Sequence, residues 1–277
     1  MINESDLFID EPDKKALLRE TFNIVADGYD ALRFFPKSAR LLAEQLGLRG
    51  DEHVLDVATG TGHAALAISR LLPRGHVTGV DFAAGMIEQA RRKASALNIT
   101  NIDFIKMDMQ SLNFPERSFD AVTCAFAIFF ADDIETQLSQ LAAVVRPGGK
   151  IAISGFQKTL FRPLIELFFQ RLNSYGIETP EPDWMRIATE SRCRQLFKAA
   201  GISNVEVKMG NVGYFIDSAD EWWKVIWNAG FRRLVNRIPD KELGRFRLEH
   251  MEEIAALKTR DGIWLDIGVI YSVGTRP

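Results

Sequence analysis

The spacing of apolar and polar positions changes in character near residue 53 of this chain. Before that point apolar residues recur three or four positions apart, as in Leu18, Phe22 and Val25, which is typical of helices. After it, short apolar runs alternate with amphipathic stretches. The runs that predict strands are 53–57, 76–80, 102–107, 119–126 and 150–155, and the stretches that predict helices are 64–72, 84–97 and 134–145. This alternation predicts a parallel sheet with right-handed crossovers.

The last part of the chain predicts a helix at 192–200, a strand at 205–209, a helical segment at 218–258 and a strand at 264–273. The helical segment interrupts two strands, so we expect it to form a cap. Ser218-Ala-Asp-Glu221 is typical of a capping box at its first helix, and Pro239 separates that helix from the next. We therefore expect a helical N-terminal lid at 1–50, a core at 51–216 and 259–277, and an inserted helical cap at 217–258.

Composition and charge narrow the classes of protein that this chain can be. Hydrophobic residues make up 47% of its 277 residues and charged residues 26%, which is ordinary for a globular protein. With 34 Lys and Arg against 37 Asp and Glu, the net charge is −3, so the broad positive field of a nucleic-acid-binding protein is missing. The longest apolar run, 121–131, is shorter than a membrane span, so we expect no stable membrane insertion.

The two cysteines, Cys124 and Cys193, lie far apart in the sequence and form no C-x-x-C motif. A disulfide framework and a zinc site built on cysteines are therefore not expected, and we expect a cytoplasmic protein without a metal.

A glycine-rich turn between a predicted strand and a predicted helix is the first candidate for chemistry. Residues 54–62 read VLDVATGTG, and residues 60–65 also fit the G-x-G-x-x-A pattern of dinucleotide-binding proteins, with Asp81 about 20 residues further on. Two other acids favour a different ligand. Asp56 lies inside the strand before the turn, where it suits a ligand that carries an ammonium group. Asp108 ends the third strand, where it suits the exocyclic amine of an adenine.

At this point the chain resembles the class I S-adenosylmethionine-dependent methyltransferases, near the ubiquinone/menaquinone-type and related small-molecule enzymes. The motifs that carry the resemblance are VLDVATGTG at 54–62, GVDFAAGMIEQAR at 79–91, MDMQSLNFPERSFDAV at 107–122, VVRPGGKIAI at 144–153 and FNIVADGYD at 22–30. The resemblance implies an α/β fold with a doubly wound, seven-stranded, mostly parallel sheet. It also implies that the last strand runs antiparallel between the fifth strand and the strand at 205–209.

The resemblance further implies a site for S-adenosylmethionine. Asp56 and the loop after it would hold the methionine end, Asp81 would accept both ribose hydroxyls, and Asp108 would accept from the adenine amine. Tyr29 would close over the methionine carboxylate, and the carbonyl of Ala125 would lie near the ammonium. The residues that the resemblance places at the cofactor are Tyr29, Asp56, Ala58, Gly60, Gly62, Asp81, Phe82, Met86, Asp108, Met109 and Ala125.

Aromatic residues suggest where a methyl acceptor would bind. All five tryptophans fall in the last third or so of the chain, and Phe129-Phe130 stands where many relatives carry a histidine pair. We expect an apolar pocket for a flat acceptor, although the tryptophans could equally form the core between cap and sheet. The residues expected to line this pocket are Phe129, Trp184, Trp223 and Trp227.

His250 is the candidate general base. It shares the apolar face of a predicted helix with Phe246 and Ile254, and this face would point either into the active site or into the core, where the imidazole would be hydrogen-bonded. His63 opens the helix after the glycine loop and is expected either near the cofactor or simply at the start of that helix.

Taken together, the sequence predicts an enzyme that transfers the methyl group of S-adenosylmethionine to a small, apolar or aromatic acceptor by in-line displacement. Two other classes stay open. One is a cofactor-binding protein of this fold that acts as a partner without catalysis, and the other is a nicotinamide-dependent oxidoreductase. The sequence leaves open the acceptor, the atom that is methylated and the oligomeric state.

Overall fold

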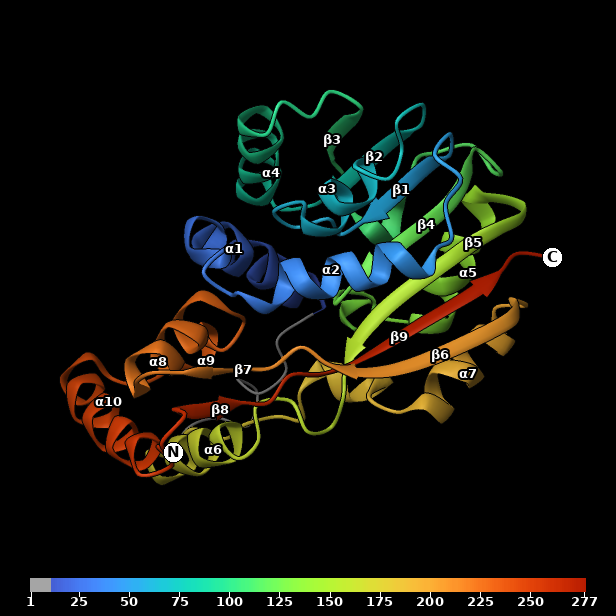
Figure 1. Cartoon of the computed structure of the whole chain (residues 1–277). Helices are drawn as coiled ribbons and strands as arrows, with labels where there is room; N and C mark the ends of the chain where they lie inside the picture. Colours follow the sequence, from blue (N-terminus) through green and yellow to red (C-terminus); the bar gives the residue numbers. More distant parts are fainter. Residues whose placement is uncertain (1–10) are drawn as a thin grey trace.

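The computed structural model of the chain describes residues 11–277, and a seven-stranded sheet forms its centre (Figure 1). The strand order is β3-β2-β1-β4-β5-β9-β6. The strands are β1 (His53–Val57), β2 (His76–Asp81), β3 (Ile102–Lys106), β4 (Phe119–Ala125), β5 (Val145–Phe156), β6 (Ser203–Asn211) and β9 (Gly268–Thr275). β1 to β5 are parallel to one another, and β9 is antiparallel to both of its neighbours, β5 and β6. The predicted doubly wound, mostly parallel sheet is therefore confirmed, including the position of the antiparallel strand.

Helices cover both faces of the sheet. α2 (Phe34–Gln45) and α3 (His63–Ser69) pack together on one face, and α5 (Ile134–Val144) and α7 (Glu190–Ala199) pack together on the other (Figure 1). α4 (Ala84–Ala96) connects β2 to β3, and α1 (Glu11–Tyr29) lies against α4. Two helices begin at side-chain caps: Asp133 accepts hydrogen bonds from the N–H groups of Glu135 and Thr136, and Thr189 accepts one from Arg192.

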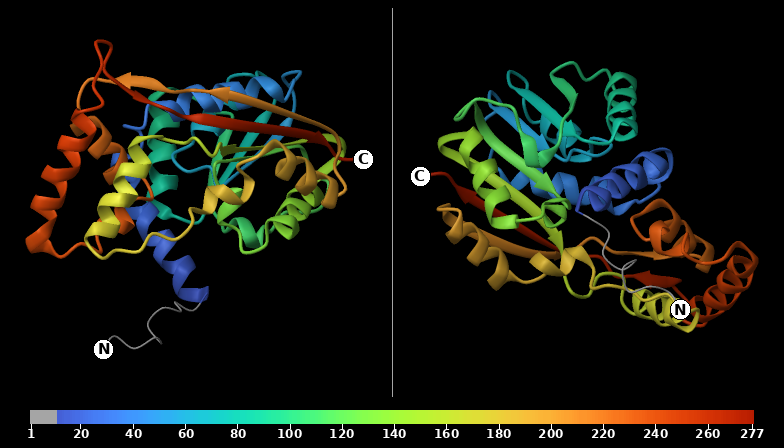
Figure 2. Two further views of the ribbon diagram at one scale, coloured as in Figure 1. Left: turned by 90° about the horizontal axis from the view of Figure 1, so that it is seen from below. Right: turned by 180° about the vertical axis from the view of Figure 1, so that it is seen from behind.

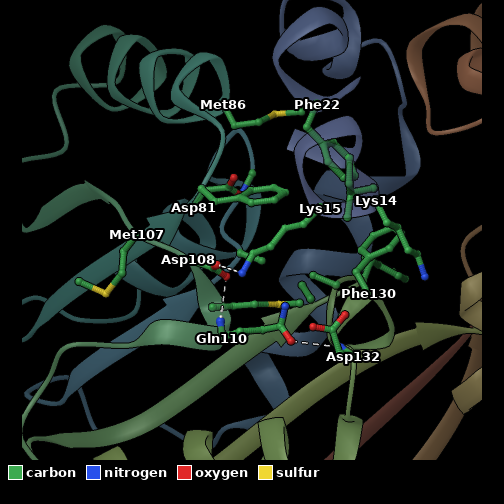
Figure 3. A pocket seen from close by; sticks show the side chains of 18 of the residues that line it. Lys14, Lys15, Phe22, Asp81, Met86, Met107, Asp108, Gln110, Phe130 and Asp132 are labelled. Atoms are coloured by element: carbon green, nitrogen blue, oxygen red, sulfur yellow. Dashed lines mark hydrogen bonds and ion pairs between the residues drawn. The ribbon is translucent and has the colours of Figure 1, made fainter. Parts of the chain in front are cut away.

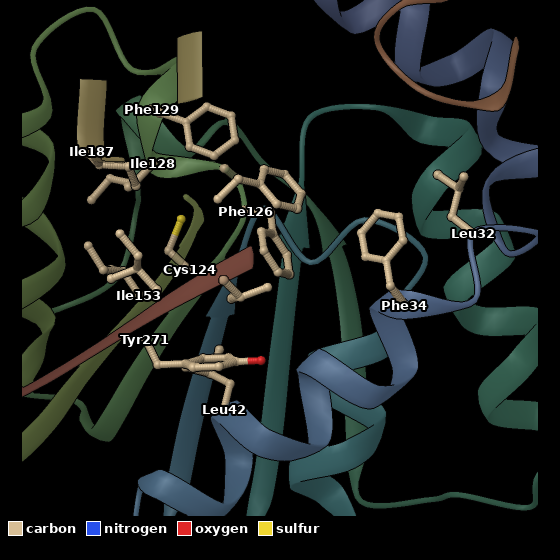
Figure 4. Packing of buried hydrophobic residues seen from close by; sticks show 14 of the residues in the cluster. Leu32, Phe34, Leu42, Cys124, Phe126, Ile128, Phe129, Ile153, Ile187 and Tyr271 are labelled. Carbon is tan, nitrogen blue, oxygen red and sulfur yellow. The ribbon is translucent and has the colours of Figure 1, made fainter. Parts of the chain in front are cut away.

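Buried apolar side chains fill the space between the sheet and its helices. Figure 4 shows part of this core, in which Leu42 of α2 lies beside Tyr271 of the sheet and Phe34 of α2 faces Phe126. The Tyr271 hydroxyl shares a hydrogen bond of 2.9 Å with Ser38, so the one polar atom of that ring is satisfied. Cys124 and Cys193 are both buried and unbonded to each other.

The prediction of one strand at 264–273 is wrong, because the structure has two strands in this range. β8 (Ile263–Leu265) pairs with β7 (Tyr214–Ile216) in a separate ribbon, and only β9 enters the main sheet. The chain changes direction at Asp266, whose carbonyl accepts a hydrogen bond of 2.7 Å from the Phe161 N–H. Trp264 therefore lies on the ribbon, opposite Phe215, and both rings are partly exposed.

The ribbon leads to a second, helical lobe beside the sheet (Figure 2). This lobe contains α8 (Ala219–Asn228), α9 (Arg232–Val235) and α10 (Asp240–Ala255), together with α6 (Leu164–Ser174), which the sequence analysis did not predict. α6 packs against α10, with the rings of Phe168 and Phe246 6.2 Å apart. The lobe is thus built from two separate stretches of the chain.

Two local expectations for this lobe have different outcomes. Pro239 directly precedes α10, as predicted. The capping box at Ser218 is wrong: the Ser218 side chain caps nothing, and Glu221 accepts from the N–H of Asp217 instead, at 3.2 Å. Among residues 11–277, no helix has the length and apolar character required to span a bilayer.

Candidate cofactor and acceptor site

A cavity opens at the carboxyl ends of the parallel strands (Figure 3). Its walls come from the residues that follow β1, β2, β3 and β4, and from one face of α1. This is the edge at which doubly wound sheets bind ligands, because the loops after neighbouring strands diverge there. The predicted cofactor residues that line it are Tyr29, Ala58, Gly60, Asp81, Phe82, Met86, Asp108, Met109 and Ala125.

The glycine loop after β1 presents its backbone to this cavity. Gly60 has a φ of +56°, and a Cβ placed on it would meet no atom within 4 Å, so a ligand can approach the main chain closely. Its N–H donates to Asp81 at 2.9 Å. The N–H of Thr59 donates to the carbonyl of Val80 at 2.8 Å, and these two bonds tie the loop to β2.

Gly62, in contrast, does not line the cavity as the sequence analysis expected. A Cβ at this position, where φ is +84°, would lie 3.1 Å from the Ala90 Cβ and 3.1 Å from the ring of Phe104. Gly62 is therefore needed where the start of α3 packs against α4 and β3, which is a packing requirement.

Asp56 is also absent from the cavity wall, in contrast to the direct role implied by the resemblance. Its carboxylate is fully buried and accepts hydrogen bonds of 2.6 Å from the hydroxyls of Thr59 and Thr123, and one of 3.1 Å from the Ala65 N–H. Burial raises the pKa of Asp56 to about 6, against the effect of these three donors. The carboxylate thus fixes the glycine loop from behind.

Asp81, at the end of β2, lies where the resemblance places the ribose of the cofactor. One carboxylate oxygen accepts from the Ala83 N–H at 2.9 Å and the other from the Gly60 N–H at 2.9 Å. Burial raises the pKa of Asp81 to about 6, and the nearby charge of Asp56 acts in the same direction. The two backbone donors fix the carboxylate in the cavity wall.

Asp108 follows β3 and lines the cavity next to Met109. One of its oxygens accepts from the N–H of Gln110 at 2.9 Å, and the other forms an ion pair with Lys15 of α1 (Figure 3). The sequence analysis did not predict this contact, because no local pattern shows that α1 crosses the end of β3.

Tyr29 and Asp30 join α1 to the glycine loop. The Tyr29 ring stacks on Phe35 at 4.8 Å, and burial together with the charges of Asp81 and Asp30 raises the pKa of its phenol well above the usual range. Asp30 accepts from the hydroxyl of Thr61 at 2.6 Å. The sequence analysis missed Asp30 as an individual residue, although it ends the quoted motif at 22–30.

Two further side chains, one from α4 and one from α3, contact Asp30. Lys93 of α4 and His63 of α3 each place a nitrogen 2.9 Å from the same oxygen. Partial burial raises the pKa of Asp30, but the hydrogen bonds from His63, Thr61 and Lys93 outweigh it and hold the pKa below its usual range. His63 therefore contacts Asp30 and does not line the cofactor cavity.

A second, aromatic cavity adjoins the first and lies between the sheet and the helical lobe. Twelve of its 25 lining residues are aromatic, including the predicted Phe129 and Trp184. Five side chains border both cavities: Lys14, Phe22, Tyr29, Phe126 and Phe130. Phe126 directly follows β4 with a φ of +55°, which is uncommon for a residue with a side chain, and its ring stacks on Phe156 at 4.4 Å.

Trp223 and Trp227, which the sequence predicted in the acceptor pocket, line neither of these two cavities. They stack on each other at 6.1 Å in a shallow groove on the outside of the helical lobe. The guanidinium of Arg232 lies 4.5 Å from the Trp227 ring and that of Arg247 lies 5.5 Å from the Trp223 ring. These contacts hold α8 against α9 and α10.

His250 likewise lines neither cavity, so the expectation that it acts as a base is not supported. The imidazole is fully buried between α6, α8 and α10. Its Nε2 accepts a hydrogen bond of 2.9 Å from the Trp222 indole, and its Nδ1 lies 3.3 Å from a carboxylate oxygen of Glu253. It is the hydrogen-bonded core histidine that the sequence analysis kept as its alternative.

The fold and the first cavity define a class of protein: an α/β enzyme that binds a nucleoside-containing cofactor at the carboxyl edge of a doubly wound sheet. The model of a family described as a methyltransferase domain matches residues 54–149. The demethylmenaquinone methyltransferase of Thermus thermophilus is 37% identical over 160 residues, which are 54% of this chain and 72% of the relative. The enzyme of the same name from Deinococcus radiodurans is 33% identical over 172 residues, or 59% of this chain and 71% of the relative.

The fold of the chain is similar to that of the YcgJ protein from Bacillus subtilis, with a TM-score of 0.60 and 22% identity over 87% of this chain and 98% of that one. The chain belongs to the class I S-adenosylmethionine-dependent methyltransferases.

The described residues fit the cofactor of this family. A buried carboxylate, Asp81, faces the cavity where two hydroxyls would donate to it, and Asp108 can accept from an amine once Lys15 moves aside. The open backbone at Gly60 leaves room for the methionine end. When bound, S-adenosylmethionine supplies an electrophilic methyl group on a sulfonium.

Proposed function

We propose that this methyltransferase acts on a small, flat and apolar acceptor, which binds in the aromatic cavity beside the cofactor. The observation that carries the proposal is that the two cavities share part of their lining. An acceptor in the aromatic cavity would therefore meet a methyl group held in the cofactor cavity where the two cavities adjoin. The demethylmenaquinone methyltransferases support an acceptor with an apolar ring, because they match more than half of this chain.

The described residues contribute position more than reactive groups. Phe22, Tyr29 and Phe126 would hold the acceptor and the methyl group in line and keep water from the sulfonium. Holding two reactants in the reactive geometry can lower a barrier by roughly 7–11 kcal/mol. In-line displacement at a sulfonium methyl requires little else from the protein.

Phe169 of α6 tests the acceptor site, because it lines the aromatic cavity without bordering the cofactor cavity. For Phe169→Ala, we expect a KM for apolar aromatic acceptors that rises about tenfold or more, since the acceptor loses a large apolar contact. The Kd for S-adenosylmethionine should stay within about twofold. Both are measured on a panel of planar apolar and polar acceptors, with S-adenosylhomocysteine as the detected product.

Phe215→Ala provides a matched control, because Phe215 is a partly exposed ring on the ribbon and lines neither cavity. It should change neither quantity. An equal loss in both variants, or acceptors without an aromatic ring turned over as well as aromatic ones, would contradict the proposal.

A further inference from the structure

Among the side chains of residues 14–277, those at the junction of the two cavities include no carboxylate and no imidazole, the usual general bases. The reacting atom of an acceptor must lie at this junction, where the lining is shared. Five side chains of residues 14–277 border both cavities, and of these five three are phenyl rings and two, Lys14 and Tyr29, can titrate. A general base must be within hydrogen-bond reach of the proton that it removes, so residues that border one cavity alone are poorly placed.

The acidic side chains are divided between the two cavities. Asp81, Asp108 and Asp132 border only the cofactor cavity, and Glu181 and Asp183 border only the aromatic cavity. Among the described residues, none of the carboxylates and none of the four imidazoles lines both. The shared wall, as far as residues 14–277 form it, therefore has no carboxylate and no imidazole.

The two titratable groups on the shared wall are hydrogen-bond donors. The ammonium of Lys14 has N–H donors and no acceptor, and it lies 3.6 Å from a carboxylate oxygen of Asp183. Burial and the charges of Asp81 and Asp30 raise the pKa of the Tyr29 phenol, so its O–H stays protonated at neutral pH. Both groups can donate to an anion, and neither can take a proton from an acceptor.

From the shared wall we infer that the acceptor is a planar aromatic molecule whose attacking atom is already ionised in water at neutral pH, and that this anion binds beside the cofactor without help from a base. The inference rests on the proposed function, since it concerns the same aromatic cavity. The acceptor class is thus an acidic phenol or a stabilised enolate, whose negative charge is spread over the ring system.

The charges of the reaction agree with this assignment. The acceptor anion forms a bond to the methyl carbon with its own electron pair while the carbon–sulfur bond breaks and leaves its pair on sulfur. The positive and the negative charge disappear together, and no proton moves. Such a step is favoured in a cavity lined by apolar rings, because attraction between opposite charges is stronger away from bulk water.

Equilibrium binding of two probes tests the inference without relying on turnover. The probes are 2-naphthoate, which is an anion, and 2-naphthamide, its neutral counterpart. Each is titrated calorimetrically into the protein saturated with S-adenosylhomocysteine, whose sulfur is neutral, or with sinefungin, which carries an ammonium near the position of the sulfonium. We expect 2-naphthoate to bind about tenfold more tightly in the sinefungin complex, equivalent to about 1.4 kcal/mol. The 2-naphthamide affinities should differ by less than about twofold.

Three variants test whether the probes bind in the aromatic cavity and whether Lys14 contacts the anion. Lys14→Met should weaken 2-naphthoate binding several-fold and leave 2-naphthamide unchanged, whereas Lys198→Met, a matched loss of charge at an exposed position of α7, should change neither. Phe169→Ala should weaken both probes, which shows that they occupy the aromatic cavity.

Three results would overturn the inference. If both probes bind and neither distinguishes the two cofactor complexes, the acceptor need not be an anion, while the proposed function stands. The same holds if 2-naphthamide shows the larger preference. If neither probe binds, the aromatic cavity is not an acceptor site, and the proposed function fails with the inference.

Discussion

Asp56 and Asp81 show how two buried carboxylates on neighbouring strands take different tasks. Burial raises the pKa of each carboxylate to about 6. The oxygens of Asp56 accept hydrogen bonds from Thr59, Thr123 and the backbone, whereas Asp81 lines the cofactor cavity. The difference arises from position: Asp56 lies within β1 and Asp81 is the last residue of β2.

Removal of the Asp81 carboxylate should weaken cofactor binding. Hydrogen bonds to a charged group contribute about 1.5–3 kcal/mol, so for Asp81→Ala we expect a Kd for S-adenosylmethionine that is roughly 10- to 150-fold higher. Titration calorimetry measures it, and the circular dichroism of the unliganded variant checks that the chain still folds. Unchanged affinity in a folded variant would refute the ribose assignment.

The raised pKa of Asp81 also predicts a pH dependence of binding. Adenosine, which lacks the amino-acid group, should bind more weakly as the pH falls through about 6, because its ribose hydroxyls donate to the ionised carboxylate. Calorimetry from about pH 5 to pH 8 measures this change, and Asp81→Asn should remove most of it. An affinity for adenosine that is independent of pH in the unchanged protein would speak against the prediction.

The Asp81 carboxyl also makes the stability of the unliganded folded chain depend on pH, and here a lower pH is favourable. Its folded-state pKa lies above the ordinary value for an aspartate, so the unliganded folded chain holds the proton more tightly than the unfolded chain does. The stability that this provides is present at low pH and is lost as the pH rises through about 6.

At the scale of elements, α1 is held over the cofactor cavity by an apolar contact with α4 through Val25, Ala26 and Met86 and by polar contacts at its end. Asp30 joins the end of the helix to Thr61, His63 and Lys93. We expect Asp30→Ala to raise the Kd for S-adenosylmethionine several-fold, because Tyr29 and the glycine loop lose their common anchor. Asp27→Ala, on the exposed side of α1, should have no such effect in the same binding assay.

The helical lobe depends on the His250–Trp222 contact. We expect His250→Ala to lower the free energy of unfolding by about 1–3 kcal/mol, because the Trp222 N–H loses its acceptor in a buried site. Activity per folded molecule should stay nearly intact. Thermal melts and turnover on the same samples measure both, with Glu252→Ala, at an exposed position of α10, as the control. A His250→Ala variant that is as stable as the unchanged protein but inactive would support the hypothesis that His250 is a general base.

Burial also lowers the pKa of His250. The folded chain therefore resists its protonation, and this contribution to stability is lost as the pH falls below the ordinary pKa of histidine.

The molecule as a whole should respond to ligand in a localised way. S-adenosylhomocysteine at about 100 times its Kd should stabilise the folded chain by about 2.7 kcal/mol. Hydrogen exchange through local opening should slow in α1 and the glycine loop and stay unchanged in α10, which lines neither cavity. Protection spread evenly over the chain would show that the ligand orders the helical lobe as well.

Much of the sheet could be predicted from the sequence because its signals are local. The runs around Leu55, Val80 and Val122 are short, apolar and bounded by turns, and the strand order followed from the family resemblance. The acceptor site could not be predicted in the same way. It depends on how α1 and α6 cross the ends of the strands, so Lys14, Phe22 and Phe126 become neighbours only in the folded chain.

The tryptophans show the limit of an argument from composition. Trp184 lines the aromatic cavity, whereas Trp223 and Trp227 stack on each other outside it, and Trp264 lies on the ribbon. All four residues are tryptophans. Whether each one lines a cavity or packs elsewhere depends on the direction in which its side chain points, which composition does not reveal.

The antiparallel strand in the middle of the sheet has a consequence for synthesis of the chain on the ribosome. β5 ends at Phe156 and its partner β9 begins at Gly268, so residues 157–267 must be made before the two can pair. At roughly 5–20 residues per second this takes of the order of 5 to 20 s. During that time the apolar edge of β5 lacks its native partner in the nascent chain, and an unpaired strand edge is prone to aggregation. The growing polypeptide should therefore need a chaperone most after β5 has emerged and before β9 has followed it.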